Sequence, residues 1–333
     1  MIFLLIVSCD TQSVKRDRFF LEANQQLKDR NFDQAVGLYD EALKIDPSFA
    51  DAWNNRGTAL FQNDKYAEAI ESYNKAILTD YGNPRLYLNR SNAYYKLKEY
   101  RSSLLDIDQA AEMLPDTSVI PFMKATVYFQ LADYDSSLYY FKQSLLKDSS
   151  NVETFVNMAS ACFYKNDTSG ADRYLKKAFK MDPGNSDAQN VMSLVMMEKG
   201  KPGEALAWVN RALTSSPDDP FYLNNRGFFY LEMDSLERAE RDINSSMEID
   251  PDNGWAYRNK GIFYLKNKRY DDALRVIKEA KRLNENIKLV DYYLGNVYEK
   301  MGNRAEACGA YQESMKKGEG PGKKAYDRFC KGR

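Results

Sequence analysis

The feature that most constrains this chain is a repeat of 34 residues. Pro47, Pro115, Pro183, Pro217 and Pro251 are separated in turn by 68, 68, 34 and 34 residues. The same spacing divides the sequence, without insertion or deletion, into nine units that begin at residues 16, 50, 84, 118, 152, 186, 220, 254 and 288. A fixed period of this length is typical of repeat proteins, whose units share one stacked core. Although 333 residues favour about two domains, the repeat predicts a single array over 16–321.

Three positions of the repeat hold only small side chains. The eighth, twentieth and twenty-seventh residues of all nine units, 27 positions in total, are alanine, glycine or serine. These residue types make up roughly a quarter of ordinary sequence, so chance would place them at about seven of these positions. Small side chains let two helix backbones approach closely, so the pattern predicts that the first helix of each unit, helix A, packs on the second, helix B.

Tyrosine recurs at the eleventh position, as at Tyr94 and Tyr264, and turn signals such as Asn63-Asp64 lie between the small positions. Together these features resemble the tetratricopeptide repeat (TPR) family over residues 16–321. The resemblance implies an all-α fold, a right-handed α-solenoid of nine helix-turn-helix units. The last segment, 322–333, is predicted to be a capping helix, because its apolar residues recur at helical spacing: Ala325, Tyr326, Phe329 and Cys330. The fourth unit is the weakest, since Pro121 falls in its helix A and serine replaces alanine at two small positions.

In TPR proteins helix A lines the concave face, and asparagine recurs there at the sixth position of the unit. The candidate peptide-binding amides are Asn55, Asn89, Asn157, Asn225 and Asn259. An amide both donates and accepts hydrogen bonds, so a row of amides could hold the backbone of an extended peptide. This row is similar to the asparagine ladder of the O-linked N-acetylglucosamine transferases. The alternative is that these asparagines belong to the family consensus on a solvated face.

Aromatic residues follow the amides in the C-terminal third of the predicted groove, notably Phe221, Trp255 and Tyr292. Aromatic side chains are common anchors at binding surfaces, so a two-part site is one hypothesis: amides hold the main chain, and aromatics hold an apolar side chain. The alternative is that the last helices and loops cover these aromatics. The basic and amide residues that some TPR proteins use to hold a chaperone tail never occur here as a complete set.

The N-terminus resembles a bacterial lipoprotein signal. Residues 1–9 form an apolar run that ends at Cys9 and lacks a preceding lysine or arginine, and we interpret it as a truncated signal peptide with a lipobox. Residues 10–15 would then be a tether, and Cys9 would be lipidated and hold the protein at the bacterial cell envelope, outside the cytoplasm. The alternative is an unprocessed N-terminus on a soluble cytoplasmic adaptor, similar to a co-chaperone.

Two further cysteines form a candidate disulfide. Cys308 lies in the last helix B and Cys330 in the capping helix, where antiparallel packing would place them opposite each other. In an exported protein they could be oxidised. The alternative is a pair of reduced thiols, and Cα atoms more than ~7 Å apart could not be bridged without backbone movement.

Composition and motifs argue against catalysis. The chain has no histidine, which removes imidazole-based acid–base chemistry and metal ligation, and no phosphate-binding or nucleophile motif occurs. Its net charge of −1 gives no reason to expect nucleic-acid binding. We therefore expect a protein-interaction scaffold without catalytic residues, metal, cofactor or small-molecule substrate, which binds a peptide or partner protein in its groove and the membrane through a lipid.

Overall fold

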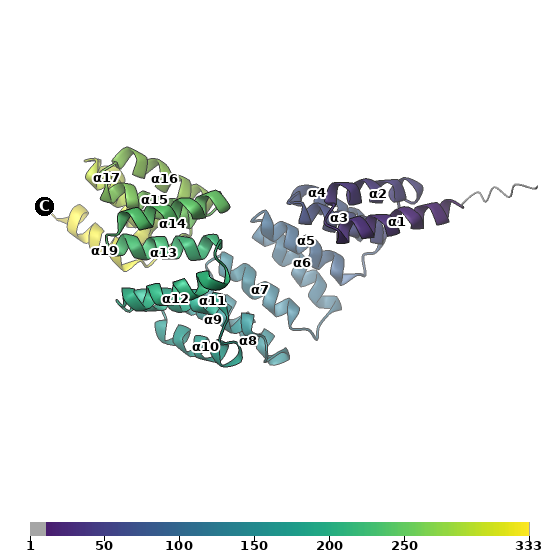
Figure 1. The fold of residues 1–333 in the computed structure, drawn as a ribbon, viewed down its shortest axis with the longest axis horizontal. Coiled ribbons are helices and arrows are strands. Elements are labelled where there is room, and N and C mark those ends of the chain that lie inside the picture. Colours follow the sequence, from purple (N-terminus) through teal and green to yellow (C-terminus); the bar gives the residue numbers. More distant parts are fainter. Residues whose placement is uncertain (1–10, 333) are drawn as a thin grey trace, which may run out of the picture. The chain divides into compact units, whose positions relative to one another are not determined.

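The computed structural model describes residues 11–332, which form α-helices with a final π-helical turn and contain no strand. The helices alternate between the two roles predicted from the repeat (Figure 1). The A helices are α1 (Gln12–Lys28), α3 (Ala50–Gln62), α5 (Pro84–Lys96), α7 (Val119–Gln130), α9 (Val152–Tyr164), α11 (Ser186–Glu198), α13 (Pro220–Glu232), α15 (Gly254–Lys266) and α17 (Val290–Lys300). The B helices are α2 (Phe32–Ile45), α4 (Tyr66–Thr79), α6 (Tyr100–Met113), α8 (Tyr134–Lys147), α10 (Thr168–Met181), α12 (Pro202–Ser215), α14 (Leu236–Ile249), α16 (Tyr270–Leu283) and α18 (Arg304–Lys316). The predicted all-α repeat fold is confirmed.

The chain divides into two compact units, residues 1–149 and 150–333. The first unit contains α1–α8, and the second contains the remaining helices. The division falls at the end of the fourth repeat, which the sequence marks as the weakest. Pro121 does not interrupt that repeat, because it is the third residue of α7 and lies in the first turn, where a missing N–H breaks no intrahelical hydrogen bond.

The small positions of the repeat lie where helix A meets helix B. Every alanine at the eighth, twentieth and twenty-seventh positions is completely buried. Glycine brings the helices closest: a β-carbon on Gly227 would lie 2.8 Å from Cγ1 of Ile243 and 3.3 Å from the carbonyl oxygen of Ala239. The predicted steric role of these positions therefore accounts for the pairing of helices within each repeat.

The turn between the paired helices uses one backbone geometry in all nine repeats. The fifteenth residue of each repeat has a positive φ, and it is glycine only at Gly200 and Gly302. The other seven residues are Arg30, Asp64, Lys98, Ala132, Asn166, Asp234 and Lys268. A left-handed residue just after a helix lets the next amides bond the last carbonyls of that helix, as Lys65 N–H does with Leu60 O at 2.9 Å.

Basic residues at the seventh position join neighbouring repeats. Arg90 donates two hydrogen bonds to Asp106 on its own helix B, at 2.6 and 2.8 Å, and one to Asn74 on the preceding helix B, at 2.6 Å. Arg226 repeats this pattern with Asp242 and Asn210. The hydrogen bonds that Arg90 donates to Asp106 raise the pKa of Arg90 above its usual value. Each such arginine therefore ties three helices together, a role that the sequence analysis missed.

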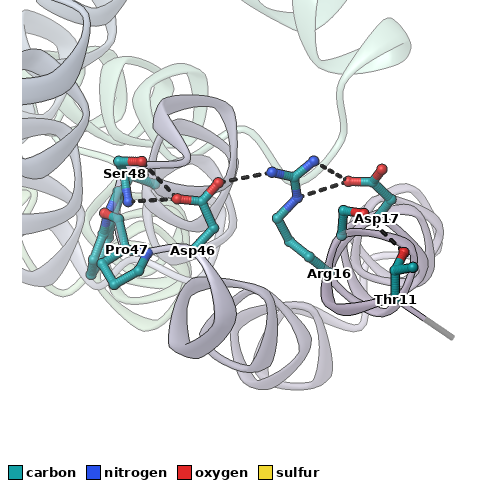
Figure 2. A network of polar contacts seen from close by, with 8 residues as sticks. Thr11, Arg16, Asp17, Asp46, Pro47 and Ser48 are labelled. Carbon is teal, nitrogen blue, oxygen red and sulfur yellow. Dashed lines mark hydrogen bonds and ion pairs between the residues drawn. The ribbon is translucent and has the colours of Figure 1, made fainter. Parts of the chain in front are cut away.

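The N-terminal repeat is held by a second polar network, which Figure 2 shows. Asp46, at the end of α2, accepts hydrogen bonds from the Ser48 hydroxyl at 2.6 Å and from Arg16 on α1 at 2.8 Å. Arg16 also pairs with Asp17 and lies 4.7 Å from the ring centroid of Phe49. The Ser48 and Arg16 hydrogen bonds lower the pKa of Asp46 below its usual value.

Both ends of the array differ in detail from the sequence prediction. The segment 10–15 was predicted to be a tether, but α1 already begins at Gln12, because the hydroxyl of Thr11 caps it by accepting the Val14 N–H. At the other end α19 (Gly320–Tyr326) and the π-helical turn Asp327–Lys331 close the last repeat. The predicted apolar stripe packs inward, with Ala325 buried against Ala307 and Tyr311.

Two glycine-to-alanine substitutions should change stability in opposite directions. Gly227→Ala should lower the free energy of unfolding by about 1–2 kcal/mol, because the added methyl group overlaps Ile243. Gly37→Ala should raise it by up to about 1 kcal/mol, because Gly37 lies on the open face of α2, where alanine is the better helix former. Urea denaturation of both variants measures this, and a Gly227→Ala variant as stable as the wild type or more so would contradict the close approach at Gly227.

The Asp46 network predicts part of the acid sensitivity. The pKa of Asp46 is lower in the folded protein than in the unfolded protein, where an aspartate has a pKa of about 3.9. As the pH falls towards this value, the unfolded state therefore binds more protons at Asp46 than the folded state does. The stability from Asp46 is therefore present above about pH 4 and is lost as the pH falls further. Between pH 2 and 6 the free energy of unfolding should fall less steeply with decreasing pH for Asp46→Asn than for the wild type. Asp51→Asn, at an exposed residue of α3 outside the network, is the control, and equal acid slopes in all three proteins would contradict the assignment.

Candidate functional site

The A helices line the inner face of each unit. In the second unit α9, α11, α13, α15 and α17 contact one another in succession, and in the first unit α1 contacts α3 and α3 contacts α5. Among the described helices, successive B helices show no comparable contact. Each unit therefore curves with its A helices inside, as the family resemblance implied, and residues on these helices are the candidates for ligand contact.

In the first unit the inner-face asparagines form a continuous hydrogen-bonded chain. Asn89 donates to Asn54 at 2.9 Å, Asn54 donates to the neighbouring Asn55 at 3.1 Å, and Asn55 donates to Asn24 at 2.9 Å. The hydroxyl of Tyr39, from α2, donates to the same Asn24 oxygen at 2.6 Å. The amides of α1, α3 and α5 are thus linked along the row. We call these four asparagines the amide chain.

The amide chain retains unused hydrogen-bonding capacity. A carboxamide has two N–H donors and two acceptor lone pairs. Asn54 and Asn55 each use one donor and one lone pair within the chain, and Asn89 uses one donor. All three side chains are half-buried, and Asn92, one turn beyond Asn89 on α5, is exposed. The inner face of the first unit therefore presents both donors and acceptors to solvent.

The second unit repeats this amide pairing but buries part of it. Asn225 on α13 donates to Asn190 on α11 at 2.9 Å, and both remain half-buried. Asn259 donates to Asn224 at 2.7 Å, but Asn259 is completely buried and Asn224 nearly so. The prediction that Asn259 contacts a ligand is therefore wrong, because neighbouring side chains already cover it. Asn157 on α9 is half-buried.

The predicted aromatic part of the groove is largely filled by the protein itself. The Trp255 ring lies 5.6 Å from that of Tyr164 and is covered by the Arg258 guanidinium, 4.9 Å from its centroid. Tyr292 packs with Tyr311 in the cluster beneath the C-terminal cap. Both side chains remain half-buried, so each ring is engaged in part by the protein's own side chains. Phe221 remains available, with half of its surface exposed.

Arg258 is the centre of this filled region. It is 6% exposed, and burial lowers its pKa below the usual value for arginine. It donates to the Asn259 side-chain oxygen and, at 2.8 Å, to the carbonyl oxygen of Lys288. Within residues 11–332 no carboxylate lies at ion-pair distance from it. The burial of Arg258 has no signal in the repeat pattern of the sequence.

Lys288, in the loop before α17, reaches across the inner face of the second unit. Its ammonium group donates to the Asn166 side chain at 2.9 Å, over 122 residues of sequence, and lies 5.2 Å from the ring centroid of Phe163. Beside it is an open cleft of about 250 Å³ between α9, α11 and α13, lined by Phe163, Leu194, Met197, Glu198, Phe228, Phe229 and Glu232. This cleft is a second candidate for binding a partner.

The cysteines have different surroundings. Cys9, the predicted lipidation site, lies outside the described residues. Cys308 on α18 and Cys330 in the π-helical turn are joined by a disulfide, with their Cα atoms 5.7 Å apart. Cys162 is buried. In the described part of the chain no group of three or more acidic or cysteine side chains could hold a metal ion, and none of its helices has both the length and the apolar character of a membrane span.

Comparison with known proteins gives a consistent family. Four models described as tetratricopeptide repeat match residues 20–85, 163–224, 243–275 and 294–325, together more than half of the chain. The curated proteins gave no match.

Solved structures agree with this fold. A chain of the APC/C hetero-tetramer Cut9-Hcn1 has 15% sequence identity and a TM-score of 0.60, and the match covers 96% of this chain and 77% of that one. The structure of pilF from Pseudomonas aeruginosa has 21% identity and a TM-score of 0.52, and the match covers 63% of this chain and 96% of pilF. At these identities the likeness shows the fold alone.

Proposed function

The chain belongs to the tetratricopeptide repeat family, and we propose that it is a protein-interaction scaffold that holds an extended peptide segment of a partner along the amide chain of its first unit. The observation that carries this proposal is the linked row Asn89–Asn54–Asn55–Asn24, which is half-buried and keeps unused donors and acceptors. An extended peptide offers N–H and C=O groups along its length, so the ligand main chain complements this row.

The internal hydrogen bonds of the amide chain favour binding. They fix the orientation of the amides in the free protein, so less side-chain entropy is lost when a peptide binds. They also polarise one another, since a donor whose oxygen is already engaged is a stronger donor. Because the amides are neutral and contact the main chain, this mode demands little of the ligand's side chains.

We also propose that the protein is anchored at the bacterial cell envelope by lipid on Cys9, as the lipobox-like residues before it suggest. The Cys308–Cys330 disulfide supports an oxidising compartment, because structural disulfides are rare in the cytoplasm. The alternative is a soluble cytoplasmic adaptor, for which the same two thiols would be reduced in the cell.

The peptide site is tested by removing the amides. Replacing Asn54, Asn55 and Asn89 together by alanine should weaken binding of an extended peptide from an unbiased nine-residue array by at least about tenfold, since each hydrogen bond contributes about 1 kcal/mol. Fluorescence anisotropy with the best array peptide measures the affinity. Gln109→Ala, which removes an amide from helix B of the third repeat, is the control and should bind as the wild type does.

A change in the ligand completes this test. N-methylation of alternate main-chain amides should abolish binding, whereas substitution of the peptide's side chains should have a smaller effect. Equal affinity of the triple variant and the wild type, or tolerance of main-chain methylation, would refute a main-chain site on the amide chain. Circular dichroism of the triple variant establishes that it is folded.

The anchor is tested in bacterial cells that express the gene with its own N-terminus. A clickable fatty acid should label the wild-type protein and place it in the membrane fraction, and Cys9→Ala should remove both properties. Trapping free thiols on cell lysis should leave Cys308 and Cys330 unmodified if the protein is exported. Absence of fatty-acid labelling together with free thiols at both positions would favour the cytoplasmic adaptor instead.

A further inference from the structure

We infer that the second unit holds a lysine or arginine side chain of a partner in the cleft between α9, α11 and α13, and that Lys288 occupies the edge of this cleft in the free protein. The inference rests on the proposed function only for how the partner's main chain lies on the A helices. It adds the charge of the side chain that the partner must carry.

The charge of the cleft departs from the rest of the array. Its rim carries Glu198 and Glu232, which are the last residues of α11 and α13. The C-terminal end of a helix carries a partial negative charge, so a glutamate there is unfavourable for the helix itself. The corresponding thirteenth residues of the other repeats are Lys28, Gln62, Lys96, Gln130, Tyr164, Lys266 and Lys300. These two repeats therefore concentrate negative charge where four others carry lysine.

The walls of the cleft are apolar. Leu194, Met197 and Phe228 lie between the glutamate rim and the amide pair Asn190–Asn225, on the same faces of α11 and α13. A lysine or arginine side chain fits this arrangement. Its aliphatic stem can pack on the apolar walls while its terminal cation reaches Glu198 and Glu232. The ring of Phe163 adds an attractive face for the cation.

The protein already places a lysine at this edge. Lys288 Nζ lies 4.0 Å from Glu198 Oε2 and 5.2 Å from the ring centroid of Phe163, while its own carbonyl oxygen accepts from Arg258. Glu232 is exposed and makes no hydrogen bond or ion pair within residues 11–332. The Arg258 guanidinium lies 5.2 Å from the ring centroid of Phe228 and attracts Glu232 electrostatically, but it does not reach ion-pair distance. One carboxylate is thus partly engaged by an internal lysine, and the other is available.

The test compares two fluorescent nine-residue peptides of alternating serine and alanine that differ only at the centre, which is lysine in one and norleucine in the other. For the wild type we expect the lysine peptide to bind roughly fivefold more tightly, the effect of about 1 kcal/mol from a partly desolvated cation. Glu198→Gln with Glu232→Gln should remove this preference. Glu237→Gln, at an exposed carboxylate on helix α14, is the matched control and should keep it.

A Lys288→Met variant tests the inference independently. It retains the length of the side chain but removes the internal cation, so affinity for the lysine peptide should rise several-fold, while the norleucine peptide should change little. Equal binding of the two peptides to the wild type, or a preference that persists in the double glutamine variant, would overturn the inference and leave the proposed function intact. Binding of neither peptide at millimolar concentration would contradict both proposals.

Discussion

The close approach of two helices across small side chains is the contact on which the rest of this structure depends. One helix pair cannot bury its apolar face alone, so each repeat is stable only against its neighbours. At Gly227 the space for a β-carbon is already taken by Ile243, and the alanines at equivalent positions are completely buried. The closeness of each pair leaves the A helices to contact one another, and this sets the curvature within each unit.

The curvature of each unit determines which polar side chains on its A helices remain accessible. Where successive A helices lie side by side, a polar residue there must either bond its neighbour or remain in water. Asn54 and Asn55 do both, since they link α1, α3 and α5 and remain half-buried. In the second unit the same positions continue into Asn259 and Arg258, which are buried. One sequence pattern thus produces an accessible row in the first unit, and in the second unit an accessible pair, Asn190–Asn225, followed by a buried pair, Asn224–Asn259.

The predictions from sequence succeeded where steric periodicity decides the outcome. The helix pairs, the buried alanines and the inward face of Ala325 follow from spacing along the chain. Contacts that depend on curvature were not predictable, because the period does not state the angle between repeats. The contact between Tyr164 and Trp255 and the hydrogen bond from Lys288 to Asn166, 122 residues apart, both depend on that angle.

The arginines that tie three helices together, Arg90 and Arg226, are a different case, because the sequence contains a signal for them. Arg90 and Asp106, like Arg226 and Asp242, are separated by 16 residues, from the seventh to the twenty-third position of a repeat. A search for opposite charges at a constant offset would have found them. Because these arginines are committed to aspartates, they add no free charge to a ligand surface. Outside these arginine–aspartate pairs, our further inference assigns Glu198 and Glu232 to recognition of a partner's cation, whereas our proposed function assigns main-chain recognition to the amide chain of the first unit.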